Sequence, residues 1–100
     1  MVKLISITDS PRPDKKLVAI FDNDGRKKTV HFGAKQNGTP MDDYTITKDK
    51  KQRENYRTRH DKDLDTDDPT RAGFLSYYIL WGDSTSRAKN ISEYKKHFNL

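Results

Sequence analysis

Five aspartates follow one another closely in the middle of the chain, and carboxylates at this density are candidates for metal chemistry. The 1, 3, 5, 7 spacing of the ligands in a calcium-binding loop is repeated by Asp61, Asp63, Asp65 and Asp67. That loop also requires glycine at position 6 and a bidentate glutamate at position 12, where this chain has Thr66 and Ala72. The sequence therefore predicts a solvated acidic linker over residues 61–69, with no metal and no cofactor.

Catalytic side chains form no recognisable arrangement. The three histidines, His31, His60 and His97, are widely separated and match no metal-binding spacing. Ser84 and Ser86 lie in "DSTS" without a nucleophile elbow, cysteine is absent, and the five glycines form no phosphate-binding loop. We therefore expect a protein that is not an enzyme and has no small-molecule substrate.

Lysine and arginine are concentrated in two segments of the second half of the chain. The candidates for contact with a partner or with phosphates are Lys50, Lys51, Arg53, Arg57, Arg59, Lys95 and Lys96. Such cations bind phosphates by releasing counterions, and they also pair with protein carboxylates. Because residues 48–60 predict a helix, one face of it would carry Lys50, Arg53, Arg57 and His60. This face either recognises a partner or is a solvated surface with internal ion pairs, such as Lys50 with Glu54.

The first half of the chain predicts β-structure. Residues 2–8 are rich in β-branched side chains, and two further apolar runs, 17–21 and 29–32, flank "DNDG". Asp24-Gly25 tolerates the positive φ of a tight turn, which predicts a hairpin with Val30 and Phe32 on one face. Residues 34–43 predict a loop, and 44–47, "YTIT", a further short strand. Residues 2–46 would thus be mostly antiparallel sheet.

The second half predicts helices at residues 48–60, 70–82 and 90–98. Thr47 would cap the basic helix, and Asp68 before Pro69 would cap the next one. Gly82 stands where a helix commonly ends in a left-handed residue. Asn90, followed three residues later by Glu93, is close to a capping box for the C-terminal helix.

The segment "FLSYYILWGDSTS" is rich in aromatic residues and predicts the main core element, packed between the hairpin and the C-terminal helix. The apolar stripe recurs at helical spacing and consists of Phe74, Leu75, Tyr78, Ile79 and Trp81. Tyr77 falls off this stripe, so we expect its ring at the surface. A binding platform is the alternative interpretation, whereas the segment is too short to span a membrane.

The composition bounds the fold class and the location. One hundred residues with 31% hydrophobic side chains predict one small α+β domain with a thin core, to which burial against a partner would add stability. The net charge of +5 favours an acidic partner, which could be a protein surface, DNA or RNA, or a phospholipid face. No segment is long and apolar enough to span a membrane or resembles a signal peptide, which predicts an intracellular protein that is not secreted.

Several segments in a fixed order resemble a known group of proteins. They are "TVHFGAK", "KKQRENYRTRH", "DDPTRAGFLSYYILWGDSTS" and "NISEYKKHFNL", within residues 16–100. In this order they resemble a family of small, uncharacterised basic proteins encoded by giant DNA viruses of algae and protists, with the acidic "DKDLDTDD" as a departure. The resemblance implies a viral product located in the virion or inside the host cell, in the cytoplasm or nucleus. It implies no known activity.

Two expectations of function result. The first is a non-enzymatic structural or interaction module, a minor capsid-associated component of the virion, whose contacts to an acidic protein partner are made by Lys50, Arg53, Arg57 and Arg59. The second is a nucleic-acid-binding protein without sequence preference. Its phosphate contacts would be made by Arg53, Arg57, Arg59, Lys95 and Lys96. Tyr56 or Tyr77 would then stack on bases.

Overall fold

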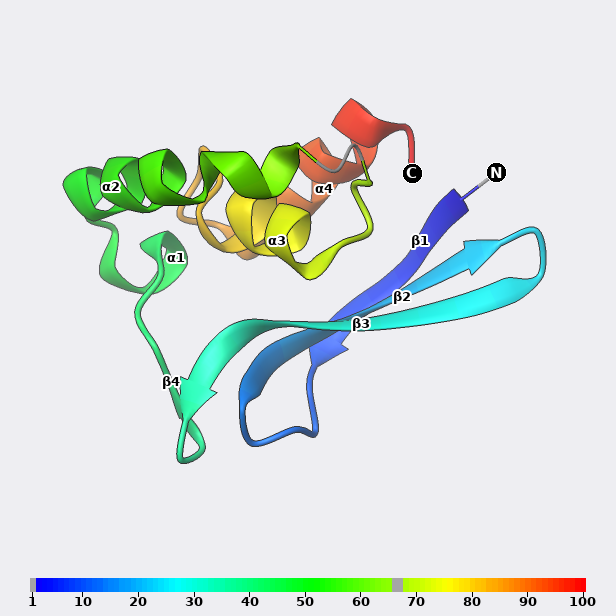
Figure 1. Cartoon of the computed structure of the whole chain (residues 1–100), viewed down its shortest axis with the longest axis horizontal. Coiled ribbons are helices and arrows are strands. Elements are labelled where there is room, and N and C mark those ends of the chain that lie inside the picture. Colours follow the sequence, from blue (N-terminus) through cyan, green and yellow to red (C-terminus); the bar gives the residue numbers. More distant parts are fainter. Residues whose placement is uncertain (1, 66–67) are drawn as a thin grey trace.

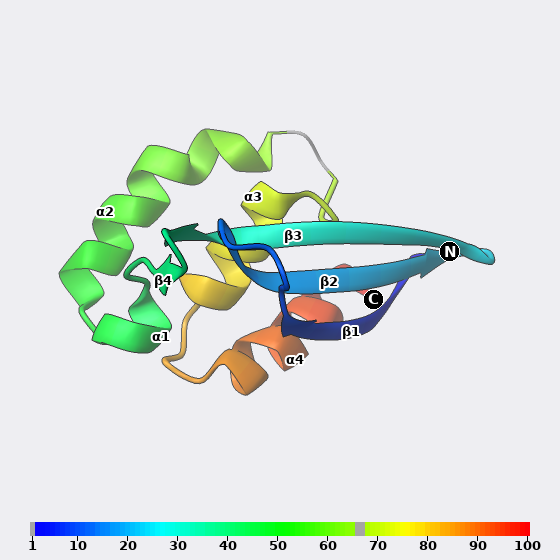
Figure 2. The same ribbon diagram turned by 90° about the horizontal axis from the view of Figure 1, so that it is seen from below.

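Strands and helices form two layers in the computed structural model, which describes residues 2–65 and 68–100. The strands are β1 (Val2–Asp9), β2 (Lys15–Asn23), β3 (Arg26–Gln36) and β4 (Thr39–Pro40). The helices are α1 (Tyr44–Thr47), α2 (Lys50–His60), α3 (Ala72–Leu75) and α4 (Arg87–Phe98). A 3₁₀ turn (Asp61–Leu64) continues α2, and a π turn (Ser76–Leu80) continues α3. Helices α1 to α4 lie on one face of the sheet (Figure 1, Figure 2), which confirms the predicted α+β class.

Two tight turns set the register of the sheet, whose strands pair in the antiparallel order β1-β2-β3-β4. At Asp24-Gly25 both residues have positive φ, 53° and 92°, so the turn matches the twist of the flanking strands. The predicted β2–β3 hairpin is therefore confirmed, with Asn23 opposite Arg26. A second turn with positive φ at both residues, Asn37-Gly38, extends β3 and adds β4 where the sequence predicted a loop.

The edge strand β1 lies beside the C-terminal residues. Its pairing with β2 is interrupted by a bulge at Ile5, whose side chain is exposed. The backbone N–H of Leu4 donates to the carbonyl oxygen of Leu100 at 3.3 Å. The two terminal segments accordingly lie near each other in Figure 1. The C-terminal residue therefore covers part of an edge whose N–H and C=O groups would otherwise be open to another chain.

The core lies between the inner face of the sheet and the helical layer. Because side chains alternate along a strand, Leu17, Ala19 and Phe21 of β2 all point toward the helices. Opposite the sheet, the buried side chains of the helical layer include Leu75, Ile79, Leu80, Trp81 and Tyr94. Phe74, which was also expected in the core, is buried as well. The Tyr94 hydroxyl donates to the carbonyl of Pro69, so the polar end of this ring is satisfied.

The aromatic segment differs from the continuous helix predicted over residues 70–82. It consists of one turn of α-helix, α3, followed by a π turn in which the N–H of Trp81 donates to the carbonyl of Ser76 at 3.0 Å. A π turn bonds residue i to i+5, so the side chains along it rotate away from the 3.6-residue period. Tyr77 is buried, where we expected an exposed ring, and Tyr78 is half-buried at the margin of the core, where we expected a core residue.

Two helices begin at caps other than those predicted. Residues 44–47 form α1 rather than a strand, because Asp43 accepts a hydrogen bond from the N–H of Thr45 at 2.8 Å and caps the turn. Helix α2 is capped by Asp49 rather than Thr47, since the Asp49 carboxylate accepts hydrogen bonds from the N–H groups of Lys51 and Gln52. Asp43 thus begins a helical turn where a strand was predicted, and Asp49 takes the place of the predicted threonine cap.

The last helix also begins earlier than predicted. Helix α4 starts at Arg87 rather than at residue 90, because Ser86 Oγ accepts a hydrogen bond from the N–H of Lys89 at 3.3 Å. Asn90, the expected cap, is instead buried within the helix. Its amide is therefore free to bind other backbone groups.

The acidic linker predicted over residues 61–69 is partly helical. Its first residues, Asp61–Leu64, form the 3₁₀ turn. Asp68 accepts hydrogen bonds from the N–H and the hydroxyl of Thr70, at 3.0 Å and 2.6 Å, so it organises a local turn and does not cap a helix. Helix α3 starts only at Ala72. Thr66 and Asp67, which belong to the calcium-like spacing, lie outside the described residues.

Candidate functional site

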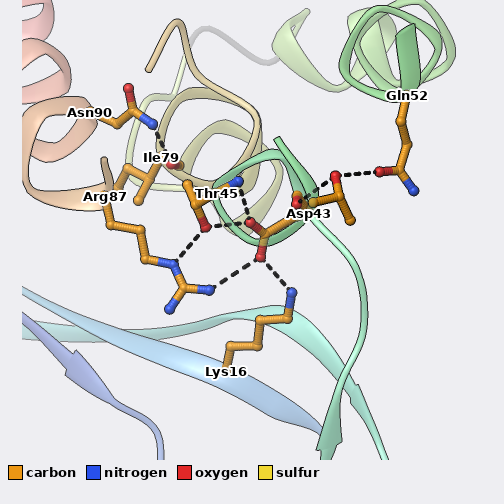
Figure 3. Close-up of polar contacts among 8 residues, drawn as sticks. Lys16, Asp43, Thr45, Gln52, Ile79, Arg87 and Asn90 are labelled. Carbon is orange, nitrogen blue, oxygen red and sulfur yellow. Dashed lines mark hydrogen bonds and ion pairs between the residues drawn. The ribbon is translucent and has the colours of Figure 1, made fainter. Parts of the chain in front are cut away.

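A buried ionic cluster joins the sheet to two helices (Figure 3). Asp43 Oδ2 accepts a hydrogen bond from Lys16 Nζ of β2 at 2.6 Å, and another from a terminal guanidinium nitrogen of Arg87 at 3.2 Å. Arg87 Nε also donates to Thr45 Oγ1 at 3.0 Å. The side chains of Lys16 and Asp43 are only 4% and 1% exposed. The cluster therefore fixes the cap of α1 and the first residue of α4 on the same strand.

The balance of interactions in this cluster keeps Asp43 ionised. Burial by itself raises the pKa of the Asp43 carboxyl group, but the hydrogen bonds from Lys16 and Thr45 and the charges of Lys16 and Arg87 outweigh burial and lower the pKa below its usual value. One carboxylate is thus shared by two cations. The cluster consequently carries one positive charge in excess.

A second polar cluster holds the loop between the π turn and α4. Asn90 Nδ2 donates to the carbonyls of Ile79 and Ser84, at 2.9 Å and 2.7 Å, and Asn90 Oδ1 accepts from the N–H of Ser84 at 3.0 Å. A β-carbon on Gly82 would stand only 2.1 Å from the carbonyl oxygen of Tyr78. Gly82 is therefore required by close packing and does not have the positive φ of the left-handed helix end that we predicted.

Two arginines of the predicted basic stripe are engaged within the molecule. Arg53 Nε donates to the carbonyl of Gly82 at 2.6 Å, and Arg53 and Arg57 both pair with Asp83, at 2.5 Å and 3.3 Å. The guanidinium carbon of Arg57 lies 4.2 Å from the centroid of the Tyr77 ring, a cation–π contact. The two side chains are only 19% and 23% exposed. Arg53 and Arg57 thus attach α2 to the loop before α4, instead of facing outward as expected.

The other candidate cations are exposed. They are Lys50, Lys51 and Arg59 of α2, and Lys95 and Lys96 of α4. Within residues 2–65 and 68–100, none of them forms an ion pair, and Lys50 does not pair with Glu54. These five side chains therefore form an open surface that a partner could contact. Arg53 and Arg57, in contrast, belong to a network of contacts inside the molecule.

The two tyrosines considered for stacking on bases are already in contact with other side chains. Tyr56 stacks on both His60 and Trp81, with ring centroids 4.1 Å and 4.3 Å away. Burial, together with the nearby charge of Asp63, raises the pKa of Tyr56 to about 12. Tyr77 is buried beneath Arg57. Neither ring presents an open face to a base.

Two grooves adjoin the segment that connects β4 to α1. The larger, of about 780 Å³, lies against α2 and the end of β3, and its lining includes Met41, Tyr56 and Trp81. The smaller, of about 630 Å³, is lined by residues of all four strands, of α1 and of the start of α4. Lys16 lines both grooves, so the ionic cluster lies where they approach each other.

One serine–histidine contact has the composition of a nucleophile and its base. Ser10 Oγ and His31 Nδ1 are 2.7 Å apart, and Ser10 Oγ also accepts a hydrogen bond from the N–H of Arg12 at 3.1 Å. Ser10 is buried, and neither Ser10 nor His31 lines either groove. The contact therefore fixes the β1–β2 connection on β3.

The described part of the chain contains neither a cluster of potential metal ligands nor a helix able to span a membrane. Within these ranges, no group of three His, Cys, Asp or Glu side chains is placed to hold a metal ion. Asp63 of the acidic run pairs with His60 at 3.0 Å. No helix among these residues combines the length and apolar character needed to cross a bilayer.

Sequence reasoning did not identify the Lys16–Asp43–Arg87 cluster. Asp43 is separated from Lys16 by 27 positions and from Arg87 by 44, so no local spacing brings the three together. The only local signal was a lysine immediately before the apolar run of β2, which is unremarkable for a strand end. The cluster depends on how α1 and α4 pack on the sheet.

Comparison with known proteins concerns mainly the N-terminal part of the chain. No curated protein and no solved structure matches significantly. The residues that do match a family, 5–60, include most of the sheet together with α1 and α2, and therefore Lys16 and Asp43 but not Arg87. Since this match covers more than half of the chain, the protein belongs to a family of unknown function (DUF5754).

Proposed function

We propose that the protein is a non-enzymatic interaction module that binds an acidic partner within a larger assembly. The observation that supports this proposal is the exposed, unpaired state, within the described residues, of the five candidate cations Lys50, Lys51, Arg59, Lys95 and Lys96 on α2 and α4. These helices belong to the layer that covers one face of the sheet, so their outer surfaces are open to a partner (Figure 1). A net charge of +5 attracts such a partner over a distance.

The resemblance to small proteins of giant viruses suggests which assembly this is, and we propose a minor, capsid-associated component of the virion. A thin core, with 31% hydrophobic residues in the chain, gains stability when a partner binds only the folded state. Mass spectrometry of purified virus particles is expected to detect the protein. Detection in infected cells but not in particles would contradict the virion assignment and would leave the acidic partner untouched.

Binding to the phosphates of DNA or RNA is the second candidate. Arg59, Lys95 and Lys96 are exposed, and contacts of this kind need no sequence preference. Base contacts have less support, because Tyr56 and Tyr77 are covered by other side chains. Nucleic-acid binding would therefore depend on phosphate contacts. With three such contacts, the affinity of the protein for DNA would fall by about 40-fold between about 50 and 200 mM salt.

Fluorescence anisotropy with labelled polyglutamate and with random-sequence duplex DNA separates the two candidates. We expect polyglutamate binding that weakens in the double variants Lys50→Glu/Lys51→Glu and Lys95→Glu/Lys96→Glu. A matched control, Lys3→Glu/Arg26→Glu, changes the net charge equally at exposed residues of β1 and β3 and should retain binding. Equal loss in the control would contradict the proposal, since it would show attraction to net charge alone. Absence of DNA binding at low salt would remove the second candidate.

A further inference from the structure

The smaller groove is lined by both cationic and apolar side chains. None of the exposed lysines of α2 and α4 is among them. Its lining includes Lys16, Lys35, Pro40, Thr45, Ile46 and Arg87. They come from β2, β3, β4, α1 and α4, so the groove exists only where the helices meet the sheet. Figure 3 shows Lys16, Thr45 and Arg87 converging on Asp43 at this place.

The groove carries a positive charge that is held in a fixed position. Lys16, Lys35 and Arg87 contribute three positive charges, whereas Asp43 beneath them and Asp9 at the rim contribute two negative ones. Arg87 is anchored by Thr45 and Asp43, and one of its terminal guanidinium nitrogens forms no hydrogen bond among the described residues. A cation that is already oriented loses little freedom when it binds a carboxylate, which favours binding here.

Exposed apolar side chains adjoin this charge. Within the described residues, three large hydrophobic side chains are exposed, and two of them, Met41 at 49% and Ile46 at 47%, flank the segment that contains Asp43. Ile46 lines the smaller groove together with Pro40. Apolar groups that remain in water beside a few oriented polar groups are typical of protein-binding sites. A phosphodiester backbone would leave these apolar groups without a partner.

We propose that this groove receives a short extended segment of a partner protein that carries an aspartate or glutamate beside an apolar residue. The carboxylate pairs with Arg87 and Lys35, and the apolar side chain packs against Pro40 and Ile46. The inference rests on the acidic partner proposed above and specifies its chemistry and its binding place. It adds a contact at the junction of sheet and helices to those made by the exposed cations of α2 and α4.

NMR chemical-shift mapping of the ¹⁵N-labelled full chain tests this proposal. Three short synthetic peptides serve as probes: two glutamates beside a leucine, two glutamates beside a serine, and two lysines beside a leucine. We expect saturable shifts of the amides of Lys35, Thr45 and Ile46 with the first peptide. Binding should be about fivefold weaker with the second peptide, since it lacks the apolar contact, and absent with the third.

Variants of exposed or half-buried groove residues distinguish the groove from the helix surfaces. Lys35→Glu and Ile46→Ser should each lower the affinity for the first peptide by about fivefold. Lys3→Glu, which reverses a charge at an exposed residue of β1 outside this groove, is the matched control and should leave the affinity within about twofold. The dispersion of each variant's spectrum verifies its fold. Arg87 is not substituted, because it also holds the ionic cluster together.

Three results would contradict the proposal that this groove binds an acidic peptide segment. Shifts confined to α2 and α4, insensitive to Lys35→Glu, would place the acidic partner elsewhere and would leave the proposed function standing. Stronger shifts of the same groove amides with duplex DNA than with the first peptide would assign the groove to nucleic acid. If neither glutamate peptide causes a saturable shift, the groove is not a binding site for such a segment. The polyglutamate measurement decides separately whether the chain binds an acidic partner.

Discussion

Asp43 joins three elements through one carboxyl group. It caps α1, accepts a hydrogen bond from Lys16 of β2 and pairs with Arg87 of α4. Removing one member of a buried ion pair leaves the other charge without compensation in a medium of low dielectric constant, which costs far more than the pair contributes. The cluster is therefore sensitive to the loss of its carboxylate, although two exposed charges at the same distance would contribute little.

Asp43→Ala should lower the free energy of unfolding by about 3–5 kcal/mol, because the buried ammonium group of Lys16 would lose its partner. Asp14→Ala is the control, since Asp14 forms an exposed pair with Arg12 at 3.1 Å and should change stability by less than about 1 kcal/mol. Urea denaturation followed by circular dichroism measures both. Similar losses in the two variants would show that the cluster is not buried as described.

Stability should also depend on pH through Asp43. Its pKa is lower in the folded chain than in the unfolded one, so the carboxylate stabilises the fold above pH about 4, and this contribution is lost as the pH falls through the folded-state pKa. The difference in unfolding free energy between the wild type and Asp43→Asn is therefore expected to be largest near neutral pH and to shrink below pH about 4. A difference that stays constant from neutral to acidic pH would contradict the lowered pKa.

Arg53 should behave as a structural residue. Its guanidinium binds the carbonyl of Gly82, a buried residue, so Arg53→Ala should destabilise the chain by about 1–2 kcal/mol. Lys51→Ala, an exposed neighbour on the same helix, should stay within about 0.5 kcal/mol. Thermal denaturation and polyglutamate binding are measured together. A stable Arg53→Ala variant that loses polyglutamate binding would restore Arg53 to the partner surface.

At the scale of elements, the connection between the π turn and α4 organises much of the helical layer. Asn90 binds the carbonyls of Ile79 and Ser84, while Arg53 binds the carbonyl of Gly82. Carbonyl groups at the end of a helical segment lack partners within it, so side chains from elsewhere must satisfy them. Helices α2 and α4 are thus attached to residues 79–84 through different backbone carbonyls of that segment.

Gly82→Ala tests this packing, since a β-carbon would collide with the carbonyl oxygen of Tyr78 at 2.1 Å. We expect a loss of about 3 kcal/mol from overpacking. Gly38→Ala is the matched control: no atom lies within 4 Å of the place that its β-carbon would take, and only its positive φ of 79° is strained. It should cost about 1 kcal/mol. Chemical denaturation of both variants measures their free energies of unfolding. A smaller loss of stability in Gly82→Ala than in Gly38→Ala would contradict the close contact between Gly82 and the carbonyl oxygen of Tyr78.

At the scale of the whole molecule, the core is shared between the two halves of the chain. The inner face of the sheet presents Phe21 and Phe32. Apart from Tyr44 of α1, the buried hydrophobic side chains of the helical layer come, among the described residues, from residues 74–94. The family match ends at residue 60, before these side chains. A sheet with one apolar face open to water is not expected to be stable alone.

A fragment of residues 1–60 should therefore remain largely unfolded, although it contains the whole sheet with α1 and α2. Its ¹H–¹⁵N spectrum is expected to show poor dispersion, whereas the full chain should show well-dispersed amides. The full chain under identical conditions is the control. A fragment spectrum that overlays that of the full chain would show that the C-terminal half is dispensable for folding.

Local patterns in the sequence were sufficient for the class of fold and for several elements. The β2–β3 hairpin followed from Asp24-Gly25 between two apolar runs, because a two-residue turn with positive φ is a property of adjacent residues. A helix near residues 48–60 and an apolar segment containing Phe74 and Trp81 followed in the same way from periodicity and composition. These features are decided within a few residues.

Only the tertiary structure decided which charges face inward. Arg53 and Lys50 have similar local contexts on α2, yet Arg53 reaches Gly82 and Asp83, which are about thirty positions away, whereas Lys50 stays exposed. Asp43, Lys16 and Arg87 likewise meet only because α1 and α4 pack against β2. The buried and exposed roles of charged side chains depend on contacts between residues far apart in the chain, and hydrophobic periodicity carries no information about such contacts.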